Sequence, residues 1–119
     1  MTSGYQIMGG EVSNLVFVTT EKFRAANPTV YAAVVAALDE AIQWTNADKR
    51  RAAKLSTKEK KLSEDDVVAI ISAPGFDFTK VPKKTFKFAE FMHHIGALKT
   101  KPGSWKDLYY AEAHSLAGD

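Results

Sequence analysis

Cysteine is absent from the 119 residues of this chain. Its absence excludes disulfide frameworks, thiolate metal sites and cysteine nucleophiles. No apolar run approaches the roughly 20 residues that a membrane-spanning helix needs, and residues 1–10 lack the basic start and apolar core of a secretory signal. The formal net charge of +2 is too small to indicate nucleic acid or a membrane surface as a partner.

The bulk composition is that of an ordinary globular domain. Apolar residues make up 45% of the chain and charged residues 25%, which disfavours intrinsic disorder and fibrous structure. A chain of this length forms one domain at most, and it is long enough to bury about two thirds of its unfolded surface. Composition therefore narrows the class of protein without indicating a function.

The clearest strand signal lies at residues 15–19, where Leu15, Val16, Phe17 and Val18 are consecutive. Such an apolar run predicts a strand that is covered on both faces, as in parallel or mixed α/β sheets. Residues 76–79 alternate over too short a length to complete a sheet, and no other segment offers a comparable strand. The sequence therefore predicts an α/β fragment that is predominantly helical, with one main strand and about five helices.

Apolar residues at three- and four-residue spacing predict the helices. Thr20 is placed to cap the first helix, and Asn27-Pro28 to end it and cap the second. Ser63 and Asp66 have the spacing of a capping box. The expected helices cover 21–26, 28 to about 44–46, part of 48–61, 64 to before Pro74-Gly75, and the interval between Val81-Pro82 and Gly96.

Residues 48–61 carry seven basic and two acidic residues. A nucleic-acid interface would pair such charges with aromatic side chains that stack on bases, and this stretch contains none. We therefore interpret it as an exposed helix followed by a loop, and we predict no nucleic-acid partner.

Candidate chemistry is sparse. His93 and His94 are adjacent, so on a helix they point about 100° apart and do not share one metal ion, and His114 is distant in sequence. Glu90 and His93 have the spacing used in di-metal helical bundles, but the motif occurs once. We find no nucleophile–base–acid set and no phosphate-binding glycine loop. The sequence predicts neither an enzyme nor a cofactor or metal site.

A family resemblance follows from the order of these features. A Gly9-Gly10 pair, the apolar run at 15–19, the Asn27-Pro28 junction and the string at 87–96 (KFAEFMHHIG) follow one another, and KPGSWKDLY at 101–109 comes last. In this order the chain resembles, from about residue 5 to 118, the C-terminal portion of periplasmic solute-binding proteins of ABC importers. The nearest group is the nitrate, taurine and aliphatic-sulfonate class, which is similar to the thiamine-pyrimidine precursor proteins.

The resemblance implies positions as well as a fold. Residues 1–13 would form the hinge or interlobe crossing of a type II binding protein, and 14–119 a single partial domain, the C-terminal part of its first lobe. The implied ligand-contacting residues are Gly9, Gly10, Glu11 and Ser13, although the glycines also suit a plain hinge or turn. Trp105 and Tyr109 are expected to be packing anchors.

The expected function is the substrate-binding component of an ABC transporter for a small anionic or organosulfur/nitrogen solute. The resemblance implies a permease partner and a periplasmic or extracytoplasmic location, although this chain shows no signal peptide. We expect no tight solute binding by the chain alone, because most of the family's ligand contacts lie in parts that the resemblance does not cover. The alternative is a dimerising interaction domain without a transport role, in which a homo-oligomer completes the sheet.

Overall fold

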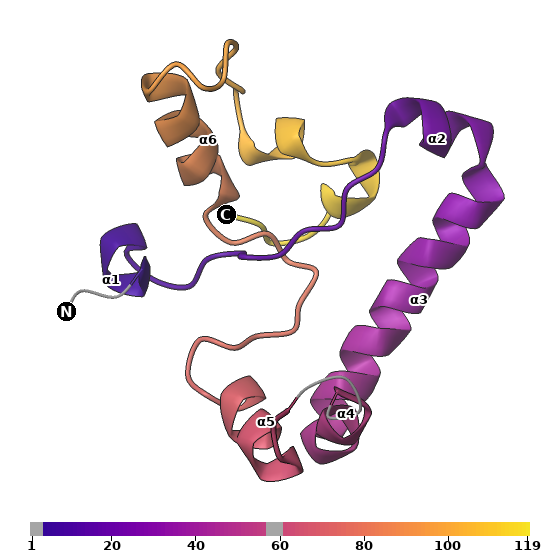
Figure 1. Ribbon diagram of the computed structural model, residues 1–119. Helices are drawn as coiled ribbons and strands as arrows, with labels where there is room; N and C mark the ends of the chain where they lie inside the picture. The colour runs from indigo at the N-terminus through magenta and orange to yellow at the C-terminus, as the bar shows by residue number, and fades with distance from the viewer. Residues whose placement is uncertain (1–3, 57–60) are drawn as a thin grey trace. The chain divides into compact units, whose positions relative to one another are not determined.

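The computed structural model describes residues 4–56 and 61–119, and every regular element within these ranges is helical (Figure 1). Among these described residues, no helix is both long and apolar enough to cross a membrane. The α-helices are α1 (Gly4–Met8), α2 (Glu21–Ala26), α3 (Pro28–Ala47), α4 (Lys49–Ser56), α5 (Glu64–Ile71) and α6 (Thr85–His94), followed by the 3-10 helices η1 (Trp105–Leu108) and η2 (Ala111–Ala113).

The chain divides into two compact units and crosses between them twice. The first unit consists of Met1–Phe17 with Lys80–Asp119, and the second is the continuous stretch Val18–Thr79. Helices α2 to α5 thus belong to the second unit, whereas α1, α6, η1 and η2 belong to the first.

In the second unit, the start of α2 follows the prediction. Thr20 accepts a hydrogen bond on its Oγ1 from the Phe23 N–H at 3.1 Å, which satisfies one of the helix's orphan donors. Pro28 is the first residue of α3 and Asn27 is its N-cap residue, as predicted, but the Asn27 side chain makes no capping hydrogen bond to α3. The Asn27 side chain instead donates from Nδ2 to the Phe23 carbonyl at 3.0 Å, so it closes α2 and is not free to cap α3.

Helices α4 and α5 contact each other and form the best-covered part of the second unit. Ala53 of α4 is fully buried, and Val67 of α5 is 5% exposed. The predicted capping box at the start of α5 is confirmed, since Ser63 and Asp66 bond reciprocally. A capping box thus begins α5, and each of the two helices buries one small apolar side chain.

In the first unit, α6 buries Ala89, which is 7% exposed, and contacts η1. The predicted glycine at the end of α6 is confirmed: Gly96 adopts φ 77° and its N–H donates to the His93 carbonyl at 3.0 Å. Trp105 of η1 makes an edge-on contact with Tyr109 and also faces His114, as expected of a packing anchor.

The predicted strand is wrong. Leu15, Val16, Phe17 and Val18 lie in a stretch without regular secondary structure, and no β-strand occurs among the described residues. A strand exists only when a second segment completes its hydrogen-bond ladder, and residues 76–79 form no strand either. The α/β class, with its main strand and its type II binding-protein lobe, is therefore replaced by an all-helical arrangement within 4–56 and 61–119.

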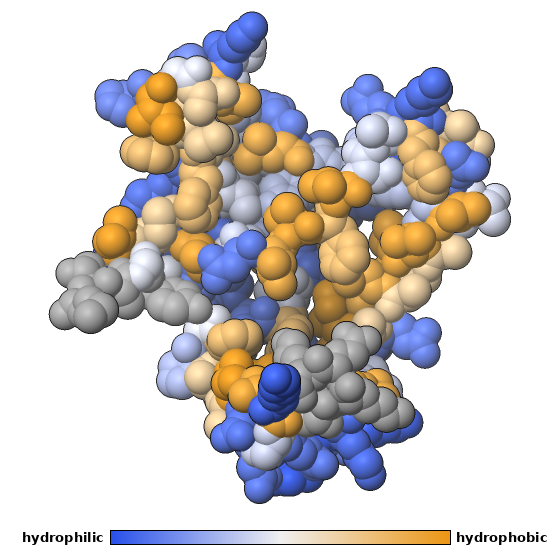
Figure 2. All heavy atoms as spheres, in the orientation of Figure 1, coloured by the Kyte–Doolittle hydropathy of each residue, from blue (hydrophilic) through white to orange (hydrophobic). Residues whose placement is uncertain are grey.

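Apolar side chains remain at the surface of both units, and Figure 2 shows many of them on the face in view. In the second unit, Val30 and Val34 of α3 are each 51% exposed. In the first unit, α6 leaves one face open. That face consists of Phe88, Phe91, Met92 and Ile95, each more than two fifths exposed.

Candidate functional site

The four residues predicted to contact a ligand lie on the segment that leads from α1 to the apolar residues 15–18. Gly9 has φ 76° and Gly10 has φ 137°. Both values lie in the region that side chains with a Cβ rarely adopt, which explains the glycine pair without a ligand. An added Cβ on Gly10 would lie 3.4 Å from Cε of Lys84, which is ordinary contact. The glycines therefore set the path of the backbone here.

Glu11 and Ser13 are brought together by a residue that the sequence reading missed, Lys83. The Ser13 N–H donates to the Lys83 carbonyl at 2.9 Å, and the Lys83 N–H donates to Ser13 Oγ at 3.0 Å. The Lys83 ammonium also forms an ion pair with Glu11 Oε2 at 2.5 Å. Segments 70 residues apart are thus joined by three polar contacts within the first unit.

Glu11, Ser13 and Lys83 form a cluster of mutually satisfied polar groups, which we call the polar anchor. Glu11 has its carboxylate balanced by an ammonium, and Ser13 uses both its N–H and its hydroxyl in backbone pairing with Lys83. Ligand contact by Gly9, Gly10, Glu11 and Ser13 stays a prediction. The sequence offers one indication of Lys83, the group of lysines at 80, 83, 84 and 87. No sequence pattern relates this group to residues 11–13.

The stretch that follows the anchor, Leu15 to Val18, is unusually apolar and exposed. Leu15 is 92% exposed, Val16 56%, Phe17 80% and Val18 86%. Among the residues that the structure describes, the backbone groups of these four make no hydrogen bond. From Val12 to Thr20 the sequence carries no charge, proline or glycine. We call Leu15–Val18 the open segment.

Two of the three histidines, His93 and His114, are engaged with backbone carbonyls. Nδ1 of His93 lies 3.0 Å from the Leu98 carbonyl oxygen. Nε2 of His114 lies 2.9 Å from the carbonyl oxygens of Lys106 and Tyr109. Within residues 4–56 and 61–119, no three His, Asp or Glu side chains are grouped as a metal ion would require. These imidazoles stabilise turns at the ends of helices.

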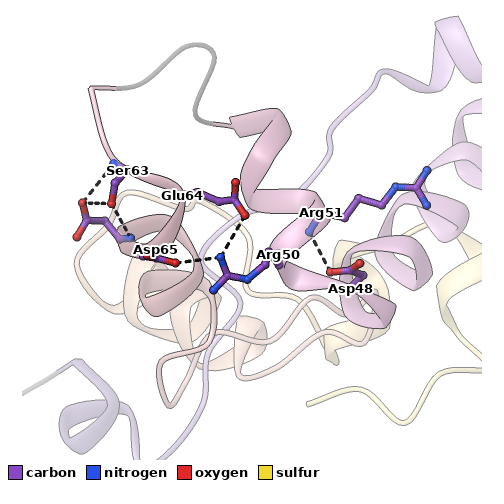
Figure 3. Close-up of polar contacts among 7 residues, drawn as sticks. Asp48, Arg50, Arg51, Ser63, Glu64 and Asp65 are labelled. Atoms are coloured by element: carbon purple, nitrogen blue, oxygen red, sulfur yellow. Dashed lines mark hydrogen bonds and ion pairs between the residues drawn. The ribbon is translucent and has the colours of Figure 1, made fainter.

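The basic stretch is paired with the acidic start of α5 (Figure 3). Arg50 contacts Asp65 Oδ1 at 2.9 Å and Glu64 Oε1 at 3.2 Å. Hydrogen bonds to Asp65 and then Glu64, reinforced by their charges, raise the pKa of the Arg50 guanidinium. The hydroxyl of Ser63, followed by its backbone N–H, lowers the pKa of Asp66. Opposite charges on α4 and α5 thus offset each other.

Other bases of this stretch are also engaged. The Arg51 N–H donates to Asp48 Oδ1 at 2.9 Å (Figure 3), while its guanidinium lies 4.9 Å from the centre of the Trp44 ring. The predicted exposed helix is confirmed as α4. Lys58 and Lys60 lie outside the described residues.

Comparison with protein-family models, curated proteins and solved structures gives no match to this chain.

Proposed function

We propose that this chain is part of the substrate-binding component of an ABC importer for a small anionic or organosulfur/nitrogen solute. The order of its sequence features supports the proposal. The glycine pair at 9 and 10, the Asn27-Pro28 junction and the KFAEFMHHIG string at 87–96 follow one another as in the family that the chain resembles. A periplasmic location and a permease partner belong to the same proposal.

The open segment carries the second half of the proposal, that the chain does not bind solute tightly by itself. Four consecutive apolar side chains are more than half exposed, and their backbone groups have no partner among the described residues. A solute site needs fixed polar groups in a largely apolar, enclosed pocket. Further polypeptide that covers the open segment would supply the enclosure that this chain lacks.

The polar anchor supports this proposal because it holds in place the segment that carries the predicted ligand-contacting residues. It fixes the path of residues 9–13 through Lys83, and ligand-contacting groups work best on segments that second contacts hold in place. Glu11 is negatively charged, so contact with an anionic solute would come from Gly9, Gly10 or Ser13, through backbone N–H groups or the hydroxyl. Lys83 would then offset the charge of Glu11 beside the anion.

Calorimetric titration tests the proposal in two arms. Taurine, an alkanesulfonate, nitrate and a pyrimidine are titrated into the 119-residue chain, and then into the chain co-expressed with the polypeptide encoded directly upstream. We expect no binding tighter than about 100 µM in the first arm and micromolar binding of one solute in the second. Micromolar binding by the chain alone would contradict the proposal that it does not bind solute tightly by itself. Absence of binding in both arms would contradict the importer role.

A further inference from the structure

We propose that Asp119 is a latch on the start of α6, and that its release loosens residues 8–13, which the same stretch of residues 82–87 holds. All of these residues belong to the first unit. The inference concerns the conformation of that unit and is independent of the importer role. It makes the order of the segment that carries the predicted ligand contacts depend on a residue that bonds to a different part of this stretch.

Helix α6 begins after a residue that is unsuited to cap it. The N-cap position holds Lys84, whose side chain makes no capping hydrogen bond, because an ammonium carries donors but no acceptor for a helix N–H. The backbone of Lys84 is also unusual, with φ 54° and ψ 26° instead of the extended angles of an ordinary N-cap. An acceptor for the first N–H groups of α6 therefore has to come from elsewhere.

Asp119 supplies this acceptor from 33 positions beyond Phe86. Its Oδ2 accepts from the Phe86 N–H at 3.1 Å. Phe86 is the second residue of α6, a position that an N-cap side chain normally serves, and the helix dipole also favours a carboxylate there. The Asp119 N–H donates to the Pro82 carbonyl at 2.9 Å. One residue thus makes hydrogen bonds on both sides of Lys84.

The backbone angles single out the two residues at this contact. Among the residues that the structure describes, Lys84 and Asp119 are the only ones other than glycine with a positive φ, at 54° and 64°. Such angles are uncommon for residues with a Cβ, and they persist where the surrounding contacts impose them. Gly118 adds a steric constraint, since an added Cβ there would lie 2.8 to 3.0 Å from the Trp105 ring. Release of the latch would therefore let both residues relax.

The stretch that Asp119 bonds to also holds residues 8–13. Lys83 exchanges two hydrogen bonds with Ser13, and Lys87 donates from Nζ to the Met8 carbonyl at 3.0 Å. If the first turn of α6 unwinds, the positions of both lysines change and these contacts weaken. Coupling between two sites is reciprocal, so loss of the Ser13 contact should loosen the latch in turn.

Amide hydrogen exchange resolved by NMR tests the latch in the full chain. Asp119→Ala removes the acceptor of the Phe86 N–H but keeps the backbone N–H that reaches the Pro82 carbonyl. We expect exchange at Phe86 and at Ser13 to become roughly 10-fold faster or more, and exchange at Ile95, just beyond α6, to stay the same. Unchanged exchange at Phe86 overturns the latch, and faster exchange at Phe86 without any change at Ser13 overturns the coupling.

Two further variants make the result specific. Asp66→Ala is the matched control, because this aspartate also accepts from a backbone N–H but lies in the second unit, and it should leave Ser13 exchange unchanged. Asp119→Asn keeps a neutral acceptor and is the milder change if Asp119→Ala also speeds exchange at Ile95. It should speed Phe86 and Ser13 together, with Ile95 unaffected. An effect of Asp66→Ala on Ser13 as large as that of Asp119→Ala contradicts the proposal.

The reciprocal change completes the test. Ser13→Ala removes the hydroxyl that accepts from the Lys83 N–H, and it should speed exchange at Phe86. In the double variant Ser13→Ala/Asp119→Ala, the increase at Phe86 should be smaller than the product of the two single increases, because either change alone already loosens the shared stretch. Increases that multiply would show that the two contacts are independent and would overturn the coupling. Such a failure leaves the calorimetric test of the importer role unaffected.

Discussion

The two units of this chain are stabilised by contacts of different range. In the second unit, most polar contacts join residues close in sequence, such as Thr20 with Phe23 and Ser63 with Asp66. The first unit adds contacts between distant segments, as where Ser13 meets Lys83, and where Asp119 bonds to the Pro82 carbonyl and the Phe86 N–H. Local sequence patterns therefore account for more of the second unit, whereas the first also depends on bringing the two ends of the chain together.

The largest effect is expected in the first unit, at Gly118. A Cβ at this position would lie 2.8 to 3.0 Å from three atoms of the Trp105 ring, so either the ring or the backbone must move. We expect Gly118→Ala to lower the free energy of unfolding by about 1–3 kcal/mol, measured by chemical denaturation. Gly4→Ala is the matched control, because an added Cβ meets nothing within 4 Å there. An equal effect of both changes would contradict the packing of Trp105 on Gly118.

A smaller effect is expected in the second unit from Ser63→Ala. This change removes the hydroxyl that accepts from the Asp66 N–H at the start of α5, and loss of such a cap typically costs about 1 kcal/mol. Ser72→Ala, at the other end of the helix, is the control. Amide hydrogen exchange shows whether each substitution affects only its own unit. Ser63→Ala should speed exchange in α5, and Gly118→Ala should speed it in α6 and η1. Identical exchange patterns would show that the units unfold as one.

The pH dependence is expected to be smaller still and confined to the acid side. Ser63 lowers the pKa of Asp66 in the folded chain, so the folded state binds this proton less readily than the unfolded state. The stabilisation is present above the ordinary aspartate pKa and is lost as the pH falls through the lowered folded pKa. Denaturation curves between pH 2 and 6 should show this slope in the wild type and a weaker one in Asp66→Asn.

The smallest effect is expected from Arg50→Gln. This exposed guanidinium joins α4 to Glu64 and Asp65, and exposed ion pairs contribute little because water and salt screen them. We expect a loss of stability smaller than that of Ser63→Ala, which shrinks when denaturation is repeated at 0.5 M salt. A loss as large as that of Gly118→Ala would show that the charges between α4 and α5 matter more than the local caps.

The same difference in range explains what could be predicted from the sequence. The caps at Thr20, Ser63 and Gly96 were predicted correctly, because each depends on residues at most four positions away. Asn27 was correctly placed at the junction of α2 and α3, but the sequence does not show that its side chain bonds back to the Phe23 carbonyl and leaves α3 without a side-chain cap. Local chemistry thus fixed most helix boundaries.

The strand and the anchor could not be predicted in the same way. Leu15–Val18 has strand composition, but a strand also needs a partner, and the described residues supply none. For Glu11 and Ser13 the sequence indicated positions on a crossing segment, yet their partner Lys83 lies about 70 residues further on. Such contacts depend on the whole fold, and one sequence carries no local signal for them.

The backbone N–H groups of Leu15–Val18 make no hydrogen bond among the described residues. Amide hydrogen exchange measures this directly, because exchange slows only when these N–H groups are bonded. We expect exchange at Leu15–Val18 to be much faster than in α5 and α6. Protection as strong as in these two helices would show that the segment is paired and would contradict its description as open.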